Sequence, residues 1–142
     1  MRPAGVLEAC VYAVDLPAAK TFYERVLGLV CFADVAGRHV FFRCGDAVFL
    51  VFNPEHTATV QTAVNGVPIP LHGARGPGHV AFRVGGAELP AWRRRLDELG
   101  VAIEAEVSWP SGGRSLYVRD PAGNSVELAT PETWGVRSRS AS

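Results

Sequence analysis

The stretch Asp15–Leu29, DLPAAKTFYERVLGL, decides the fold because it holds a complete helix signal. Asp15 is a suitable residue to begin a helix, and Pro17 is tolerated in the first helical turn. Apolar side chains then recur at helical spacing on one face, at Ala19, Phe22, Tyr23, Val26 and Leu27. Gly28 stands where a glycine commonly ends a helix. The stretch therefore predicts one amphipathic helix that ends at Gly28.

Short segments with strand-forming sequences surround this helix. Val6–Val14 (VLEACVYAV) precedes it and is rich in residues that favour strands. After it, turn signals at Ala36-Gly37 and Gly45-Asp46 separate three more short segments, Leu29–Val35, Arg38–Cys44 and Ala47–Phe52. A first module with the element order βαβββ is therefore predicted over residues 6–53.

The same order of elements recurs in the second half of the chain. Gly78–Val84 (GHVAFRV) predicts a strand, and an apolar helix stripe follows at Leu89, Trp92, Leu96 and Leu99. Gly100 ends this helix as Gly28 ends the first. Three strands are then predicted at Val101–Val107, Arg114–Arg119 and Asn124–Ala129. Internal repetition of this kind is a strong organisational signal. It predicts a second βαβββ module over residues 78–131.

The remaining segments are a linker and a tail. Residues 54–77 are rich in proline and glycine and show little periodicity, so they are expected to link the modules. Residues 132–142 are expected to form a frayed tail. The whole chain is therefore predicted to be one α+β domain built of two repeats, with a small-molecule site in the cupped sheet.

Composition excludes several classes of partner. The chain of 142 residues carries 14 basic and 14 acidic side chains, which gives no electrostatic reason to expect nucleic acid or a membrane surface. The apolar stretches have the length of strands, and Met1–Gly5 does not resemble a signal peptide. Three cysteines without CxxC spacing argue against a disulfide framework and a cysteine zinc site. A reducing, cytoplasmic setting is expected.

Strand alternation gathers chemical groups on one face. Successive strand side chains point to opposite faces, so Glu8, His79 and Glu127 should all lie on the face away from the helices. In a closed cup that face is partly buried, and buried carboxylates need a partner or a metal. Two carboxylates and an imidazole suit divalent Mn, Fe, Ni, Co or Zn. Each residue taken singly also fits an ordinary exposed or hydrogen-bonded strand position.

Three further residues are candidates for substrate binding. Tyr117 and Arg119 alternate with apolar neighbours and should point to the same face, where a hydroxyl and a guanidinium can orient an oxyanion. The alternative for both is a cross-strand pair at a sheet edge. Trp109 precedes a proline in a loop and is expected at the mouth of a pocket.

Several motifs resemble the vicinal oxygen chelate superfamily, which includes glyoxalase I, fosfomycin- and bleomycin-resistance proteins and extradiol dioxygenases. In the first half they are Asp15-Leu16, Phe22-Tyr23 and Leu27-Gly28-Leu29. In the second half they are Gly78-His79-Val80-Ala81-Phe82, Leu99-Gly100-Val101, and Asp120-Pro121-Ala122-Gly123-Asn124 leading to Val126-Glu127-Leu128. The resemblance covers Leu7 to Pro131. It implies a cupped, mostly antiparallel, eight-stranded open barrel around a divalent metal.

The resemblance also implies four positions for metal ligands, which fall at Glu8, Phe49, His79 and Glu127. Phenylalanine cannot ligate a metal, so the site of a standard glyoxalase I would be incomplete. Glu8, His79 and Glu127 are then expected to hold the metal, with Glu8 or Glu127 also acting as a catalytic base. Phe49 would line the substrate site. The placement of Phe49 depends on strand register, since a slip of one residue reverses its face.

Two functions remain open from the sequence. The first is a divalent-metal-dependent lyase, isomerase or dioxygenase acting on a small oxygen-rich or aromatic substrate. The second, implied by the bleomycin-resistance branch of the superfamily, is a metal-free protein that sequesters a small molecule in an apolar groove. The resemblance further implies a homodimer.

Overall fold

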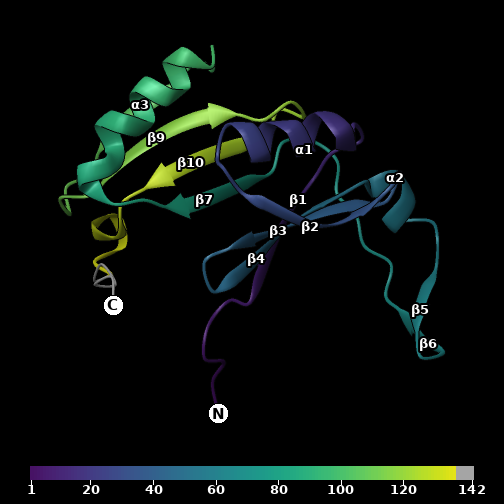
Figure 1. The fold of residues 1–142 in the computed structure, drawn as a ribbon. Coiled ribbons are helices and arrows are strands. Elements are labelled where there is room, and N and C mark those ends of the chain that lie inside the picture. The colour runs from purple at the N-terminus through teal and green to yellow at the C-terminus, as the bar shows by residue number, and fades with distance from the viewer. Residues whose placement is uncertain (137–142) are drawn as a thin grey trace. The chain divides into compact units, whose positions relative to one another are not determined.

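The computed structural model describes residues 1–136 and divides into two compact units (Figure 1). Unit 1 comprises Met1–Gly78 and Pro121–Asn124. Unit 2 comprises His79–Asp120 and the described residues from Ser125 onward. The units are described separately below.

Unit 1 contains the first βαβββ module. Its elements are β1 (Glu8–Tyr12), α1 (Leu16–Arg25), β2 (Val30–Val35), β3 (His39–Cys44) and β4 (Ala47–Phe52). The four strands form one sheet in the order β1-β4-β3-β2. The strands β1 and β4 run parallel, while the other neighbours are antiparallel. The parallel neighbours β1 and β4 are not consecutive in the chain, because parallel strands need a crossover connection, which here includes α1, β2 and β3.

Unit 2 repeats this architecture with strand order β7-β10-β9-β8. Its elements are β7 (His79–Arg83), η1 (Gly86–Glu88), α3 (Leu89–Glu98), β8 (Ala105–Ser108), β9 (Arg114–Arg119), β10 (Ser125–Ala129) and η2 (Pro131–Trp134). The strands β7 and β10 are the parallel pair. The prediction of an α+β fold made of two mostly antiparallel βαβββ modules is confirmed.

Both helices begin and end where their sequences indicate. The Asp15 carboxylate accepts a hydrogen bond from the Ala18 amide at 3.0 Å, which satisfies a free N–H of the first turn of α1. Gly28 and Gly100 adopt positive φ angles of 69° and 67° after α1 and α3. Only glycine adopts this conformation without steric cost, so each residue stops its helix cleanly.

The core of unit 1 lies between α1 and its sheet. Tyr23 on α1 is fully buried, and its ring centroid lies 4.7 Å from that of Phe49 and 5.8 Å from that of Phe42. Alternation along each strand explains this placement, because Phe42 and Phe49 are direct cross-strand partners on the same face. The core of unit 2 contains Leu96, Leu116, Val118, Val126 and Leu128, none more than 1% exposed.

Three segments differ from their sequence-based descriptions. The linker, residues 54–77, contains a short helix α2 (Pro54–Thr57) and a hairpin of β5 (Thr62–Val64) and β6 (Val67–Ile69). Strand β8 begins four residues after the predicted Val101, because the Val101 amide still donates to the Leu96 carbonyl in the end of α3. Within the predicted tail, η2 is ordered, and the residues after 136 lie outside the described part of the chain.

Candidate metal centre

His79 and Glu127 form a close pair on unit 2. His79 begins β7 and Glu127 lies in the middle of the adjacent parallel strand β10. The Nε2 atom of His79 lies 3.3 Å from Oε2 of Glu127. The Glu127 side chain is 8% exposed, whereas the His79 side chain is 52% exposed. The pair is therefore anchored in the sheet at its carboxylate and open to solvent at its imidazole.

The imidazole of His79 also has partners on its far side. Its Nδ1 atom lies 3.1 Å from the Ser125 carbonyl oxygen, which can only accept, and 3.2 Å from the Ser125 hydroxyl, which can donate or accept. When Nδ1 donates to the carbonyl, the neutral ring presents its Nε2 lone pair toward the Glu127 carboxylate 3.3 Å away, and a cation can lie between the two atoms. When Nδ1 accepts from the hydroxyl, Nε2 carries the proton and donates it to Glu127.

The geometry of the pair fits a divalent metal. Two ligand atoms at about 2.1 Å from one ion, at an angle between octahedral and tetrahedral, lie about 3.0 to 3.4 Å apart. The observed separation of 3.3 Å falls in this range. Imidazole and carboxylate suit first-row transition metals, and the backbone carbonyl on Nδ1 is a common outer partner of a metal-bound histidine. Within each unit, residues 1–136 show no group of three or more His, Cys, Asp or Glu side chains able to hold a metal.

The other oxygen of Glu127 is held by Ser115, which Trp109 contacts in turn. Ser115 on β9 donates a hydrogen bond to Oε1 at 2.5 Å, and Ser115 is completely buried. The indole N–H of Trp109 in turn donates to the Ser115 hydroxyl at 2.8 Å. The indole N–H of Trp109 thus has an intramolecular partner, and the position of Trp109 at a pocket mouth stays a prediction. Ser115 was not among the residues predicted from the sequence, although it lies two positions before Tyr117 on β9 and so shares its face.

Tyr117 lies beside the pair, as alternation predicts. It is the cross-strand partner of Glu127, and its ring centroid lies 6.3 Å from that of His79 at an interplanar angle of 23°. Burial raises the pKa of the Tyr117 hydroxyl above 10.0, and a hydrogen bond to the charged Glu127 carboxylate raises it further. A smaller opposing effect comes from Ser115. Tyr117 is therefore protonated at neutral pH.

Arg119 has an intramolecular partner. Its Nε and Nη2 atoms donate to the two carboxylate oxygens of Glu104 at 2.5 and 2.9 Å. This is the planar two-point geometry that arginine favours with carboxylates. The pairing holds the pKa of Glu104 below its ordinary value. The geometry matches the structural alternative for Arg119, and a role in substrate binding stays a prediction.

Glu8 and Phe49 lie in unit 1. Glu8 begins β1 and is exposed, and its participation in a centre with the His79–Glu127 pair stays a prediction. The expected position of Phe49 on the face away from the helix is wrong, because its ring packs against Tyr23 of α1 and is 2% exposed.

Strand register shows the source of this error. In unit 2, Glu127 pairs with Ala81, two residues after His79. In unit 1, Cys10, two residues after Glu8, pairs with Leu50. The counterpart of Glu127 is therefore Leu50 rather than Phe49. Leucine cannot ligate a metal, so this position still lacks the fourth metal ligand of a standard glyoxalase I.

The face of unit 1 that carries Glu8 is rich in rings. The Tyr12 hydroxyl lies 2.7 Å from Nδ1 of His72, and the His72 ring meets Phe52 edge-on at 4.6 Å between centroids. His72 comes from the linker, which therefore covers part of this face. Phe41 lies 5.3 Å from Phe52, also edge-on. Burial raises the pKa of the Cys10 thiol on the same face, so it is not a thiolate at neutral pH.

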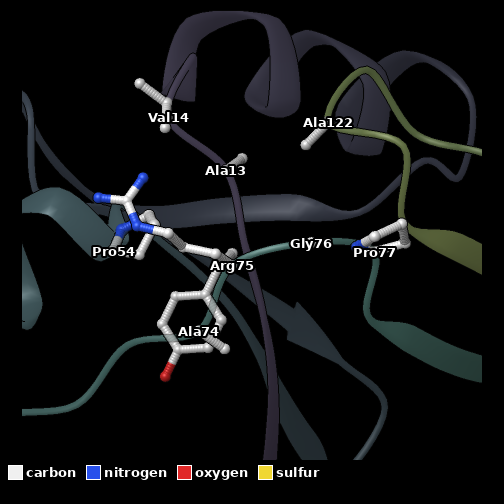
Figure 2. Close-up of a pocket in the computed structure, with 9 residues that line it drawn as sticks. Ala13, Val14, Pro54, Ala74, Arg75, Gly76, Pro77 and Ala122 are labelled. Atoms are coloured by element: carbon white, nitrogen blue, oxygen red, sulfur yellow. The ribbon is translucent and has the colours of Figure 1, made fainter.

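A separate hollow opens at the end of β1 in unit 1. It is lined by Tyr12, Ala13, Val14, Pro54, Ala74, Arg75, Gly76, Pro77 and Ala122 (Figure 2). Small apolar side chains and backbone predominate, and Arg75 supplies the one charged side chain of this lining. None of the residues predicted from the sequence to form the site lines this hollow.

None of the helices within residues 1–136 could span a membrane.

Comparison with known proteins places these features in a family. The model of the Glyoxalase/Bleomycin resistance protein/Dioxygenase superfamily matches residues 5–128. A lactoylglutathione lyase from Agrobacterium tumefaciens is 40% identical, with a TM-score of 0.87 over 95% of this chain and 99% of that one. Metallothiol transferase FosB from Bacillus licheniformis is 29% identical over 82% of this chain and 68% of its own length.

A more distant structure shares the fold. The fosfomycin resistance protein FosX from Mesorhizobium loti is 22% identical, with a TM-score of 0.60 over 92% of this chain and 93% of that one. The repeated βαβββ modules and the match over most of the sequence lead to one conclusion. The chain belongs to the glyoxalase/bleomycin resistance protein/dioxygenase superfamily.

Proposed function

We propose that this chain is a divalent-metal-dependent enzyme whose metal is held by His79 and Glu127, with Glu8 as a third protein ligand. The observation that carries the proposal is the distance of 3.3 Å between Nε2 of His79 and Oε2 of Glu127. In the tautomer in which Nδ1 donates to the Ser125 carbonyl, the Nε2 lone pair is available for a cation. Three protein ligands leave open positions for substrate.

Each residue has a role that follows from its chemistry. The metal, when bound, acts as a Lewis acid that stabilises negative charge on a substrate oxygen. Tyr117 lies beside the pair, so its ring can form one wall of the substrate site. The exposed Glu8 carboxylate can accept a proton from the substrate as a general base.

The named relatives favour one class of reaction. Both names include a thiol compound, glutathione in lactoylglutathione lyase and a metallothiol in FosB. Lyase or thiol-transfer chemistry on a small oxygen-bearing molecule is therefore favoured over ring cleavage by dioxygen. Leu50 stands where a fourth ligand would be, so the centre differs from that of a standard glyoxalase I. A homodimer is part of the proposal.

A second candidate is metal-free sequestration of a small aromatic molecule. It is favoured by the ring-rich face of unit 1, where Phe32, at 44% exposure, lies 6.2 Å from Phe41 between ring centroids. An exposed aromatic surface of this kind suits binding by stacking. Such a protein would keep its ligand affinity after complete removal of metal.

Metal analysis distinguishes the two candidates. The protein is purified without an affinity tag, and its metal content is measured before and after incubation with Mn, Fe, Ni, Co or Zn. Near-stoichiometric metal that is lost in His79→Ala and Glu127→Ala supports the metal-dependent enzyme. The control variant Glu98→Ala, at an exposed position of α3, should retain the metal. No bound metal under any of these conditions would refute it.

An activity assay then tests the reaction class. The metal-loaded protein is incubated with lactoylglutathione, and free glutathione and the three-carbon product are both measured. Lyase cleavage gives glutathione and an equal amount of the ketoaldehyde, whereas hydrolysis of the thioester gives glutathione and lactate. Formation of the ketoaldehyde that is absent from Glu127→Ala supports lyase chemistry. A metal-loaded protein that is inactive here but consumes thiol in the presence of an electrophile supports thiol transfer.

A further inference from the structure

Two side chains of unit 2 form a hydrogen-bond chain that ends on Glu127. Trp109 donates from its indole nitrogen to the Ser115 hydroxyl at 2.8 Å, and Ser115 meets Oε1 of Glu127 at 2.5 Å. Ser115 is fully buried, and Glu127, taken as a whole residue, is 6% exposed. The loop before β9 and the two strands β9 and β10 are thereby linked at one carboxylate.

The direction of this chain is fixed by chemistry. An indole N–H can only donate, so the Ser115 oxygen must accept from Trp109. The single hydroxyl proton of Ser115 then goes to an acceptor, and Oε1 of Glu127, which as a carboxylate can only accept, lies 2.5 Å away. The Tyr117 hydroxyl is a further hydrogen-bond neighbour of Ser115. By occupying one acceptor position of the serine oxygen, Trp109 helps to direct this proton to Glu127.

We propose that Trp109 and Ser115 are positioning residues that hold Oε1 of Glu127 and so present Oε2 as a one-atom metal ligand beside Nε2 of His79. This inference rests on the proposed metal-dependent function. Its physical basis is that one carboxylate oxygen is already engaged in a short bond within the sheet, while the other faces the imidazole at 3.3 Å. Outer partners of this kind set the orientation of a ligand and the affinity for the metal.

The test uses two substitutions with matched controls. Trp109→Phe keeps an aromatic ring and removes the N–H, and Ser115→Ala removes the hydroxyl. Trp134→Phe and Ser108→Ala change exposed residues of the same unit and serve as controls. Affinity for Mn²⁺ alone is measured by calorimetry on the apo protein, and circular dichroism checks that each variant is folded.

The expected result is a weakening of Mn²⁺ binding by roughly tenfold or more in Ser115→Ala, with a smaller loss in Trp109→Phe and none in the controls. The double variant Trp109→Phe/Ser115→Ala should bind as Ser115→Ala does, because the indole acts only through the serine hydroxyl. Losses that simply add would show two independent packing effects and overturn the proposal. Unchanged affinity in Ser115→Ala would also overturn it.

A metal-free measurement separates this inference from the proposed function. In the apo protein, the indole N–H of Trp109 should be protected from hydrogen exchange and should lose that protection in Ser115→Ala but not in Ser108→Ala. If the wild-type protein binds no metal while the protection is seen, the proposed function fails and so does the assignment of Oε2 as a ligand. If metal binds but the indole N–H is unprotected in the wild type, only the positioning role is refuted.

Discussion

Replacement of Phe49 by alanine tests whether strand register places this side chain in the core of unit 1 or on the opposite face of the sheet, which carries Glu8. Phe49 is 2% exposed, and its ring lies 4.7 Å from Tyr23 and 6.1 Å from Phe42 between centroids. Truncation of a buried phenylalanine costs about 3–5 kcal/mol of the free energy of unfolding. Each lost aromatic contact accounts for about 0.5–1.5 kcal/mol beyond buried area, so the upper half of that range is expected.

The matched control is Phe32→Ala in the same sheet. Phe32 is 44% exposed, and its main contact is the Arg43 guanidinium 4.1 Å from its ring centroid. An exposed contact of this kind contributes about 0.5–1 kcal/mol. Urea unfolding followed by circular dichroism gives both values. If Phe49→Ala costs no more than Phe32→Ala, Phe49 is not in the core and the assignment of Leu50 as the counterpart of Glu127 fails.

Three further predictions concern packing, pH and metal. A Cβ added at Gly113 would overlap the backbone of Thr133, so Gly113→Ala should lower the melting temperature strongly, whereas Gly5→Ala, with open space, should not. Burial, and then the nearby Arg38 charge, lower the pKa of His39 below 6.5. The unfolded chain therefore binds more protons, and stability should fall as pH drops below about 6.5; a melting series in which His39→Gln shows the same acid loss would contradict this. Mn²⁺ at about 100 times its dissociation constant should stabilise the protein by about 2.7 kcal/mol in thermal unfolding, and an equal gain in His79→Ala would place the metal elsewhere.

The architecture of the chain was predictable because local signals repeat. Asp15 and Gly28 mark the ends of the first helix, and Gly100 marks the end of the second, through backbone preferences that need no tertiary contact. The order of elements in unit 2 followed from the repeat, whereas the pairing of β7 with β10 came from the structure. Alternation then placed His79, Tyr117 and Glu127 on one face, and the structure brings these three together.

Alternation alone does not predict the strand register of β4. The sequence of β4, AVFLVF, is apolar at every position, so period-two patterning does not indicate which face holds Phe49 and which holds Leu50. Only the pairing of Cys10 with Leu50 settles the faces. The β5–β6 hairpin does have a local signal, because Asn65-Gly66 is a two-residue hairpin turn, but the prolines and glycines around it led to the prediction of a linker.

The sequence by itself therefore determined the two modules, their helix ends and the face shared by His79 and Glu127, since these depend on local propensity and on the alternation of strands. Tertiary structure alone decided how the Glu127 carboxylate is held. Ser115 and Trp109 meet it only because β9 pairs with β10 and the loop before β9 folds back, and hydrogen-bond direction depends on atoms brought within 3 Å from distant positions in the chain.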